Sequence, residues 1–326
     1  MAQGSSKPSL VAVVVTHNRR AALEVTLERL LESDPNELAR IVLVDNASSD
    51  GTAAWLATLD DPRLEVLTNT QNLGGAGGFE QGMRHAAAHH DPDWLVLMDD
   101  DARPEPGALA AFLAGDRAGA EAWAAAVYHP DGRICDMNRP SRNPFWRRDV
   151  LWRTLTGGGR DGFHLGAADY AGTAPLSIDG TSFVGFFISR AGIERGGFPD
   201  GGLFVYGDDA LYTLRLTSRG GRIIFDPNLR FEHDFTTHTD ADRRVRPMWK
   251  CYYLYRNLLL VYRLSAGPWF VLAGPAAGLK WLANVRHYRG ARLRFLALVL
   301  RAIRDGFLGR TDASFEQVRD WAGEGR

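Results

Sequence analysis

The chain has 326 residues, 45% of them hydrophobic and 24% charged, with a formal net charge of −1. This length accommodates one large domain with an appendage and a sizeable core. The two cysteines, Cys135 and Cys251, are far apart and form no CxxC pattern. Their spacing indicates neither a disulfide framework nor a structural zinc site, which fits a reducing cytosol.

Neither the start of the chain nor its most apolar stretch has the pattern of a membrane segment. Residues 1–9 lack the apolar core of a signal peptide and are predicted to be a disordered lead-in. Residues 254–272 are interrupted by Arg256, Asn257 and Arg263, so no transmembrane helix is predicted there.

In the first hundred residues, apolar runs alternate with segments of helical periodicity. Three apolar runs are predicted as buried strands: residues 10–15, residues 41–44 and the run that starts at Trp94. Residues 64–67 are predicted as a further strand. The predicted helices between them are residues 21–31, 52–59 and a segment that ends at His90. Strict alternation of strand and helix predicts a mostly parallel α/β sheet with right-handed crossovers.

A polar cluster follows each of these four strands. The clusters are residues 16–19, 45–52, 72–78 and 99–101. The carboxyl ends of parallel strands meet at one edge of the sheet, which is where ligands bind in such folds. The four clusters are therefore predicted to form one binding site.

Three consecutive carboxylates, Asp99, Asp100 and Asp101, stand at the tip of the fourth strand. Because burying charge is costly, such a cluster is usually exposed, paired or bound to a cation. Oxygen ligands suit a hard divalent ion, Mg²⁺ or Mn²⁺, which often takes substrate phosphates as further ligands. A solvated acidic turn is the alternative interpretation.

The second half of the chain is less regular. Residues 157–159 are three glycines, interpreted as a flexible loop and a candidate lid within the irregular segment 120–190. Residues 183–188 are apolar again. Asp208 and Asp209 begin a helix that residues 218–221 are expected to end.

Several motifs of other enzyme classes are absent. Glu80 occupies the third glycine position of a GxGxxG motif, and neither a P-loop nor a GxSxG motif occurs. His85 and His89 lie four residues apart without the Glu of HExxH, so they are interpreted as a solvated helix face.

Four segments resemble the nucleotide-binding half of the inverting family 2 glycosyltransferases, which have the GT-A fold. In chain order they are VVTHNR (14–19), VDNASSDGT (44–52), NLGGAGGF (72–79) and MDDD (98–101). The resemblance covers about residues 10–240 and implies a GT-A domain over residues 10–242. The NLGGAGGF run, the three acids, the DDALY helix start and a later histidine are most similar to galactofuranosyltransferases. The dTDP-rhamnose-using rhamnosyltransferases are near neighbours.

The resemblance implies a set of donor-binding residues. They are Thr16, Arg19, Asp45, Asn72, Gly74, Gly75, Asp99 and Asp100. Asp45 would contact the uracil or ribose, and an Asx turn with Asn46 is its alternative role. Arg19 would stack on the base or pair with phosphate, although a surface role stays open. Gly74 and Gly75 would let the backbone approach the nucleotide closely, or would serve only the turn.

The resemblance also implies a metal site. Asp99 and Asp101 match the outer acids of the family's DxD motif, and His233 resembles its third metal ligand. Together they would hold Mn²⁺ or Mg²⁺ against the donor phosphates. Asp100, which points the other way in an extended tip, would contact the sugar or ribose.

Asp209 is the predicted general base. A carboxylate at a helix start can take the proton of the acceptor hydroxyl while that oxygen attacks the anomeric carbon. Asp208 is the competing candidate, since acids at this helix position also serve as caps. One base opposite a metal-bound leaving group implies a single displacement, and therefore inversion.

Residues 243–326 are predicted to form a basic, aromatic-rich helical region. Residues 243–310 contain 14 Lys and Arg against one acid, Asp305, and the YYLYRN run at 252–257 also resembles this glycosyltransferase group. Basic residues among Trp, Tyr and Leu in amphipathic helices suit an anionic membrane surface. Packing on the catalytic domain and a homo-oligomer interface are the alternatives, and no nucleic-acid partner is expected.

These features together predict a metal-dependent inverting glycosyltransferase, cytoplasmic or peripheral on the inner face of the cell membrane. The favoured donor is UDP-galactofuranose, and the acceptor is a hydroxyl of a cell-surface glycan or a lipid-linked glycan. The nearest alternative is a dTDP-rhamnose-dependent rhamnosyltransferase. A sugar-1-phosphate nucleotidyltransferase would need a GxGTRL-like loop after the first strand, and a non-catalytic glycan-binding scaffold would not need the acids.

Overall fold

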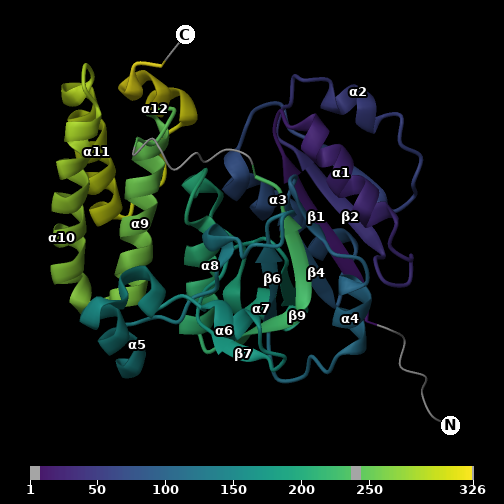
Figure 1. The fold of residues 1–326 in the computed structure, drawn as a ribbon. Helices are drawn as coiled ribbons and strands as arrows, with labels where there is room; N and C mark the ends of the chain where they lie inside the picture. The colour runs from purple at the N-terminus through teal and green to yellow at the C-terminus, as the bar shows by residue number, and fades with distance from the viewer. Residues whose placement is uncertain (1–7, 236–243, 325–326) are drawn as a thin grey trace.

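The computed structural model describes residues 8–235 and 244–324 and has two parts that lie side by side (Figure 1). The larger part is a twisted sheet with helices on both faces, and the smaller part is a bundle of helices. The predicted boundary at residues 242 and 243 lies outside the described residues, as do residues 1–7 of the predicted lead-in. Ser9 lies against the sheet, where its backbone amide donates to Asp93 Oδ2 at 2.8 Å.

The first half of the sheet is parallel, as the alternation of strand and helix predicts. It consists of β1 (Leu10–Thr16), β2 (Arg40–Asp45), β3 (Leu64–Thr68) and β4 (Trp94–Asp99), in the order β3-β2-β1-β4. Every residue of β1 is buried, as expected for a strand that is covered on both faces. The register pairs Thr16 with Asp45 and Val15 with Asp99, which brings the strand ends to one edge.

The second half of the sheet is mixed. Beyond β4 lie β8 (Phe186–Ser189), β6 (Ala122–Tyr128), β9 (Ile223–His233) and β5 (Ala102–Pro104), while β7 (Leu176–Ile178) also pairs with β9. The β6–β9 pair is parallel, whereas β8, β5 and β7 pair antiparallel with their neighbours. The apolar run predicted from residue 183 is β8, which begins at Phe186.

Helices cover both faces of the sheet. On one face, α1 (Arg20–Leu31) and α4 (Ala108–Ala114) pack against alternate β1 side chains such as Ala12 and Val14. On the other face, α3 (Gly74–His89) and α8 (Asp208–Ser218) pack against Val11 and Val13. The shorter helices are α2 (Thr52–Leu56), α6 (Ala167–Tyr170) and α7 (Arg190–Gly196). The helix predicted at 52–59 is therefore shorter than expected.

The prediction of a flexible loop at residues 157–159 is wrong. The helix α5 (Arg148–Arg153) continues into a π-helical turn, Thr154–Gly158, and a 3-10 turn, Gly159–Gly162. Gly157 and Gly159 have φ values of 108° and 49°, which lets the chain reverse between the two turns. The glycines thus serve a compact helical segment, not an open lid. Further 3-10 turns span Asp136–Asn138, Gly201–Leu203, Gly267–Trp269 and Ala283–His287.

The smaller part confirms the predicted helical C-terminal region. It consists of α9 (Lys250–Ala266), α10 (Phe270–Leu282), α11 (Arg292–Leu308) and α12 (Phe315–Ala322). Tyr252, Tyr253 and Phe295 are buried in its core together with Phe204 from the larger part, so the bundle packs on the sheet domain.

One described stretch, Lys250–His287, is long and apolar enough to cross a membrane by length and composition. The backbone turns within it at Gly267, where φ is 52°. As a result α9 and α10 lie side by side as two helices (Figure 1), which does not favour a single spanning rod.

Candidate active site

The acid tip of β4 turns back toward the sheet. β4 ends at Asp99, and after a short turn β5 pairs antiparallel with the end of β9. In this register Ala102 lies opposite His233. A histidine 132 residues away in sequence is thereby placed beside Asp101. The extended tip expected from the sequence is not formed.

The three predicted metal ligands meet at this turn. One ligand atom each of Asp99, Asp101 and His233 lies within 4.8 Å of the others. His233 Nε2 is 3.1 Å from Asp101 Oδ1, and His233 Nδ1 is 2.8 Å from Asn138 Oδ1. Because the amide oxygen accepts, Nδ1 carries the proton in the neutral ring and Nε2 is left to bind a cation. Sequence reasoning missed Asn138, which no motif marks.

The donor set fits a divalent cation of the Mn²⁺ type. Asp101 and His233 are buried, so their charges are poorly screened by water. Carboxylates suit Mg²⁺ and Mn²⁺ alike, whereas an imidazole ligand is more typical of transition metals than of Mg²⁺. Two carboxylates with one imidazole therefore fit Mn²⁺ better than Mg²⁺.

The pKa values of the three predicted ligands are shifted in different directions. Burial and the charge of Asp101 raise the pKa of Asp99 to about 6. Burial also opposes ionisation of Asp101, but hydrogen bonding to His233 and the charges of His233 and Arg19 lower its pKa overall. Burial disfavours a charged His233, yet hydrogen bonds to Asp101 and Cys135 raise its pKa to about 10. Cation binding at Nε2 requires His233 to release that proton.

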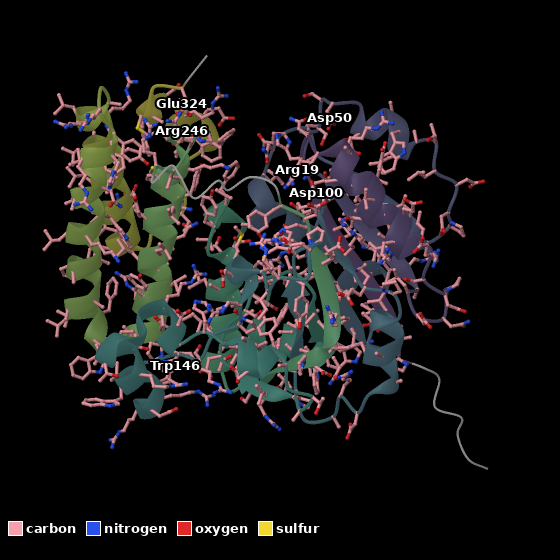
Figure 2. All side chains as sticks on the ribbon, in the orientation of Figure 1. Arg19, Asp50, Asp100, Trp146, Arg246 and Glu324 are labelled. Carbon is pink, nitrogen blue, oxygen red and sulfur yellow. The ribbon has the colours of Figure 1, made fainter. Side chains whose placement is uncertain are left out.

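Asp100 turns inward and is buried, and its contact with the sugar or ribose stays a prediction. Its Oδ2 accepts a hydrogen bond from Thr16 Oγ1 at 2.7 Å. Arg19 joins the same group, with Nε 3.5 Å from Asp100 Oδ1 and Nη2 2.6 Å from Asp101 Oδ2. Burial raises the pKa of Asp100 to about 7. Thr16 and Arg19 thus stabilise the turn formed by residues 99–101, which we call the acid turn. Figure 2 shows Arg19 and Asp100 together at this end of the sheet.

Asp45 is fully buried at the end of β2. Its Oδ1 accepts the amide hydrogen of Ser48, three residues on, at 2.9 Å, whereas an Asx turn would bond the backbone two residues on. Its Oδ2 has no hydrogen-bond partner among the described residues. An unpaired buried acceptor is costly, and an N–H or O–H group of a ligand would satisfy it.

The glycines that follow β3 form the first turn of α3. Asn72 Oδ1 accepts the amide hydrogen of Gly74 at 2.7 Å. Gly74 has a φ of 72°, and a Cβ atom there would lie 2.1 Å from the carbonyl oxygen of Phe204. Gly74 is thus required by the close approach of another backbone segment. A Cβ on Gly75 would meet nothing within 4 Å, and its contact with a nucleotide stays a prediction.

Asp208 and Asp209 occupy the first turn of α8. Burial raises the pKa of Asp209 to about 6. Burial, followed by the charge of Asp209, holds the pKa of Asp208 well above its ordinary value. The charge of Asp209 also raises the pKa of Asp99. The carboxylates at the start of α8 therefore interact electrostatically with those at the end of β4.

Lys250 brings a further cation to the site and was missed by the sequence analysis. It is the first residue of α9, and its Nζ lies 5.9 Å from the centre of the Tyr206 ring. Burial, followed by the positive charge of Arg19, lowers its pKa. The helical bundle therefore places a lysine within electrostatic reach of Arg19.

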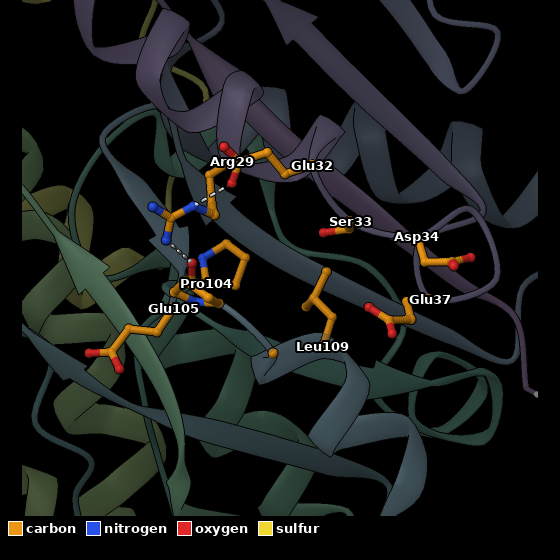
Figure 3. Close-up of a pocket in the computed structure, with 10 residues that line it drawn as sticks. Arg29, Glu32, Ser33, Asp34, Glu37, Pro104, Glu105 and Leu109 are labelled. Atoms are coloured by element: carbon orange, nitrogen blue, oxygen red, sulfur yellow. Dashed lines mark hydrogen bonds and ion pairs between the residues drawn. The ribbon is translucent and has the colours of Figure 1, made fainter.

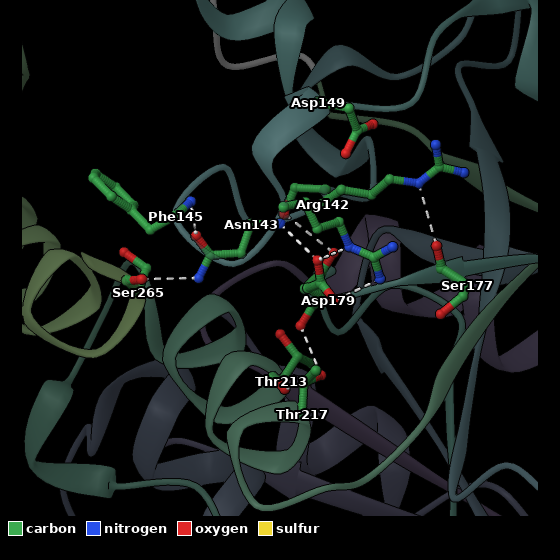
Figure 4. Close-up of polar contacts among 12 residues, drawn as sticks. Arg142, Asn143, Phe145, Asp149, Ser177, Asp179, Thr213, Thr217 and Ser265 are labelled. Carbon is green, nitrogen blue, oxygen red and sulfur yellow. Dashed lines mark hydrogen bonds and ion pairs between the residues drawn. The ribbon is translucent and has the colours of Figure 1, made fainter. Parts of the chain in front are cut away.

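A polar network holds residues 143–179, the middle segment of the chain, beside α8 (Figure 4). The carboxylate of Asp179 accepts the amide hydrogen of Asn143 at 2.7 Å and pairs with Arg147 at 2.8 Å. Thr217 Oγ1 donates to the Asp179 carbonyl at 2.9 Å, and Asn143 Nδ2 donates to the Ser265 carbonyl at 3.1 Å. The middle segment, α8 and α9 are thereby joined around the helix that carries the two acids.

A separate groove lies between α1 and the turn after β5 (Figure 3). Arg29 bridges it by donating to the Pro104 carbonyl at 3.3 Å and to Glu32 at 3.2 Å. Glu37 and Glu105 also line it. None of the predicted site residues lines this acidic groove, so it is not assigned to the donor.

Known proteins of similar sequence point to one family. The family model described as Glycosyl transferase family 2 matches residues 11–167. Galactofuranosyltransferase GlfT1 of Mycolicibacterium smegmatis is 34% identical over 211 residues, which cover 64% of this chain and 65% of that relative. Galactofuranosyltransferase GlfT1 of Mycobacterium tuberculosis H37Rv is 32% identical over 214 residues, with 65% and 66% covered. The chain thus spans slightly less than two thirds of these relatives.

Three solved structures share the fold at low sequence identity. TarS of S. aureus with UDP-GlcNAc has a TM-score of 0.58 at 12% identity, covering 96% of this chain and 89% of that chain. GalNAc-T7 with UDP, GalNAc and Mn²⁺ has a TM-score of 0.57 at 15% identity, covering 84% and 51%. Mannosyltransferase PcManGT of Pyrobaculum calidifontis with GDP-Man and Mn²⁺ has a TM-score of 0.53 at 19% identity, covering 94% and 88%. The likeness confirms the predicted GT-A fold class.

Proposed function

Because residues 11–167 belong to glycosyl transferase family 2, we propose that the chain is a metal-dependent, inverting glycosyltransferase that uses a nucleotide sugar. The observation that carries this proposal is the meeting of Asp99, Asp101 and His233 in a group that interacts electrostatically with Asp209. Relatives named galactofuranosyltransferases support galactofuranose as the transferred sugar. Neighbours bound to UDP or UDP-GlcNAc support a UDP carrier, and dTDP-rhamnose is the alternative donor.

Asp99, Asp101 and His233 Nε2 would hold Mn²⁺, with Mg²⁺ as the alternative. Two structural neighbours were solved with Mn²⁺. Bound there, the cation would neutralise negative charge on the departing nucleoside diphosphate. Arg19, whose guanidinium lies beside Asp101, would shift to pair with a phosphate oxygen. Asp45 Oδ2 would accept an N–H or O–H hydrogen from the base or ribose.

Asp209 would act as the general base. With a pKa of about 6 it is ionised at neutral pH, so it can accept the proton of the acceptor hydroxyl. The hydroxyl oxygen forms a bond to the anomeric carbon as the bond to the diphosphate oxygen breaks, and that electron pair leaves with the diphosphate. One displacement of this kind inverts the anomeric configuration.

Asp208 is the weaker candidate for the base. Its pKa is held well above the ordinary value by burial and by the charge of Asp209. A raised pKa means that a smaller fraction of this carboxyl group is ionised and able to accept a proton at a given pH. Asp208 would therefore support the charge of Asp209 or cap α8.

The replacement Asp209→Asn tests this assignment. The amide is nearly isosteric but cannot accept a proton, so turnover should fall by about 10²–10⁴ while UDP affinity changes little. The assay measures nucleotide release from a panel of UDP- and dTDP-sugars with Mn²⁺ or Mg²⁺, with Asp208→Asn as the matched control. Larger damage from Asp208→Asn would move the base to Asp208, and normal turnover in both variants would reject this helix start.

The same panel discriminates the other reaction classes. A nucleotidyltransferase would form a nucleotide sugar from a nucleoside triphosphate and a sugar phosphate, with release of pyrophosphate. A glycan-binding scaffold would release no nucleotide from any donor. Donor-dependent release of UDP or dTDP that requires Asp209 would support glycosyl transfer over both.

The acceptor is proposed to be a lipid-linked glycan at an anionic membrane surface on the cytoplasmic side. α10 and α11 expose large apolar side chains: Val271 (72%), Leu272 (65%), Leu279 (71%) and Leu293 (86%). Exposed cations follow or flank them in the chain, namely Lys280, Arg286, Arg289, Arg292 and Arg294. Apolar side chains among cations suit the interface of a bilayer with anionic headgroups.

Vesicle binding tests this surface. Binding to anionic vesicles should exceed binding to neutral ones and should weaken with salt, since exposed charges are screened over about 10 Å at 0.1 M. Leu272→Asp together with Leu293→Asp should reduce binding without changing turnover on a soluble acceptor. Equal partitioning to neutral and anionic vesicles, with a dimer in light scattering, would favour a homo-oligomer interface instead.

A further inference from the structure

The opposite end of the sheet holds a second group of metal-ligating side chains. Glu65 lies near the start of β3, and His85 and His90 lie at the end of α3. The 16 residues of α3 span about 24 Å. The start of α3 lies at the same edge of the sheet as the acid turn, so this group at the end of α3 is remote from that turn. The group takes no part in the proposed transfer reaction.

The three side chains converge on one point. Glu65 Oε1 is 2.6 Å from His85 Nε2, and Glu65 Oε2 is 2.7 Å from His90 Nε2. One ligand atom of each residue lies within 4.8 Å of the others. The sequence spacing had suggested that His85 and His89 form a solvated face. The structure instead pairs His85 with His90 through Glu65, and the ring of His89 stacks on His85 at 4.1 Å.

The geometry and exposure suit an accessible cation site. Both rings present the same nitrogen, Nε2, to one carboxylate, and the stacked ring of His89 limits rotation of His85. The side chains of His85 and His90 are 19% and 20% exposed, and that of Glu65 is 37% exposed. The ligands are therefore oriented by packing and still reachable from solvent.

We propose that Glu65, His85 and His90 bind a borderline divalent cation such as Zn²⁺. Two imidazoles and one carboxylate, with water in the fourth position, form a known tetrahedral donor set for Zn²⁺. Imidazole nitrogen disfavours Mg²⁺ and favours the later transition metals. The bound ion would tie the edge strand β3 to the end of α3 and would stabilise the folded state.

The test uses Zn²⁺ alone with the full chain free of any histidine tag. Because the acid turn can also bind Zn²⁺, calorimetry of the Asp101→Asn variant should find one Zn²⁺ equivalent bound, and added Zn²⁺ should raise its Tm. His90→Gln and His85→Gln should each weaken that affinity by at least about 10–100-fold, the loss that outer-shell partners alone cause. The control His89→Gln removes a neighbouring ring that is not a ligand, and Asp101→Asn removes Zn²⁺ binding at the acid turn.

The outcomes separate this site from the acid turn. A Zn²⁺ equivalent that survives Asp101→Asn but is lost in His90→Gln supports the proposal. If the affinity is unchanged in both His85→Gln and His90→Gln, or if no Zn²⁺ binds the native chain, the group is a hydrogen-bonded clasp and the proposal fails. Retained UDP binding in His85→Gln and His90→Gln shows that these two variants are folded.

A second inference, which rests on the proposed function, concerns the loop that leads into α8. Phe204, Tyr206 and Gly207 have φ values of 65°, 68° and 76°. Phe204 is the centre of a γ-turn, in which the Val205 amide donates to the Leu203 carbonyl at 2.8 Å. Non-glycine residues adopt this backbone region at a cost, so other contacts must hold the loop.

Two buried residues of α9 make those contacts. Asn257 Nδ2 faces the carbonyl oxygens of Leu203, Val205 and Tyr206 at 3.0, 3.0 and 2.7 Å. The preceding Arg256 donates from Nη2 to the carbonyl oxygens of Gly202 and Leu203 at 2.9 and 3.0 Å. Arg256 Nε also donates to Asn257 Oδ1 at 2.8 Å, which fixes the orientation of the amide.

We infer that Asn257 is a positioning residue that sets the approach of Asp209 to the reacting hydroxyl. Asn257 binds the loop that ends directly before Asp208 and Asp209, and it belongs to the helical bundle. Arg256 and Asn257 of the YYLYRN run therefore act on the base through the backbone of residues 202–206. This assigns the bundle a part in the chemistry besides packing.

Kinetics of Asn257→Ala test this inference. A misplacement of about 1 Å can cost about 10²-fold in rate, so kcat should fall by that order while UDP affinity stays near normal. The pH dependence of kcat should also shift, because the surroundings of Asp209 change. Asn257→Gln keeps the amide donors and should recover part of the loss. Leu258→Ala, a neighbour on α9 that makes none of these bonds, is the control.

The inference and the proposed function can fail separately. A lower Tm with unchanged kcat and pH profile in Asn257→Ala would assign Asn257 a structural role only and would overturn the inference. If Asp209→Asn also leaves turnover unchanged, the proposed base itself is rejected. Slow turnover in Asp209→Asn with normal turnover in Asn257→Ala rejects the positioning role alone.

Discussion

The two ends of the sheet carry the same kinds of metal-ligating side chain in different proportions. At the carboxyl ends, Asp99 and Asp101 meet His233, and Asp101 and His233 are almost fully buried. At the other end, one carboxylate, Glu65, meets two histidines, and all three are only partly buried. The first group favours an oxygen-preferring cation that shares phosphate ligands, and the second favours a transition metal held by imidazole.

The surroundings make the two groups electrostatically different. The acid turn also holds Asp100 and interacts with Asp208 and Asp209, so burial and mutual repulsion raise several carboxyl pKa values. The groups that shift the pKa of Glu65 in the described structure are two histidines and not carboxylates. Burial opposes its ionisation, but hydrogen bonds to His90 and His85 lower its pKa overall. The excess of buried carboxylates at the acid turn therefore creates a demand for positive charge.

The largest expected effect is at the acid turn. Asp101→Ala removes a charged ligand and leaves His233 and Arg19 without their partner. Transfer should fall to background, and metal-dependent UDP binding should weaken greatly. Calorimetry with UDP and Mn²⁺, together with the nucleotide-release assay, measures both. Asp60→Ala, an exposed acid, is the control, and full activity in excess EDTA would contradict metal dependence.

The next effect concerns the partner of His233. Asn138→Ala removes the acceptor that orients the ring, and loss of such outer-shell partners typically costs about 10–100-fold in metal affinity or activity. A Mn²⁺ titration of turnover should show the loss as a higher Mn²⁺ requirement. Asn36→Ala on the surface should behave like the native chain. An unchanged Mn²⁺ requirement in Asn138→Ala would mean that the ring is held by other contacts.

The pH dependence of turnover should follow the acid turn and not the histidine-rich end. Asp209 must be ionised to accept a proton, and its pKa is raised to about 6. The rate should therefore increase as pH rises through about 6 and level off above it. The rate profile with saturating donor checks this, with Glu65→Gln expected to retain the profile. A rate that is flat between pH 5 and 8 would exclude a base with this pKa.

The smallest effect is expected from Glu65→Gln in the absence of Zn²⁺. Because the pKa of Glu65 is lowered in the folded state, its contribution to stability is present above its ordinary pKa and is lost as pH falls through the folded value. For a half-exposed pair we expect a loss of about 0.2–1 kcal/mol at pH 7. Urea unfolding at pH 7 and at low pH measures it. A loss of equal size at both pH values would assign the effect to packing.

Local sequence pattern was enough to predict the framework of the site. Strand-like runs of four to six residues that end in polar clusters predict β1 to β4 and the edge where their ends meet, because strand formation and crossover direction depend on local pattern and chain connectivity. The resemblance predicted Asp99, Asp101 and His233 as metal ligands, and the structure brings these three side chains together. The basic, aromatic-rich helices after residue 243 were also predictable from composition and periodicity.

Which distant side chains share a site depends on tertiary packing and could not be predicted from local sequence pattern. The antiparallel pairing of β5 with β9 places His233 beside Asp101, and no local pattern specifies that register. Packing also orients Asp100 toward Thr16. It brings the backbone of Phe204 so close to Gly74 that a side chain would not fit there. These outcomes depend on contacts between segments far apart in sequence, whose geometry is fixed when the core closes.

The same reason explains the group at the other end of the sheet. Helical spacing alone pairs His85 with His89, since residues four apart lie on one helix face. His90 follows the helix, and β3 supplies Glu65 from a neighbouring element, so the structure joins His85 to His90. Sequence periodicity describes one element at a time, whereas a binding site is formed by several, and their relative placement is set by packing of the whole chain.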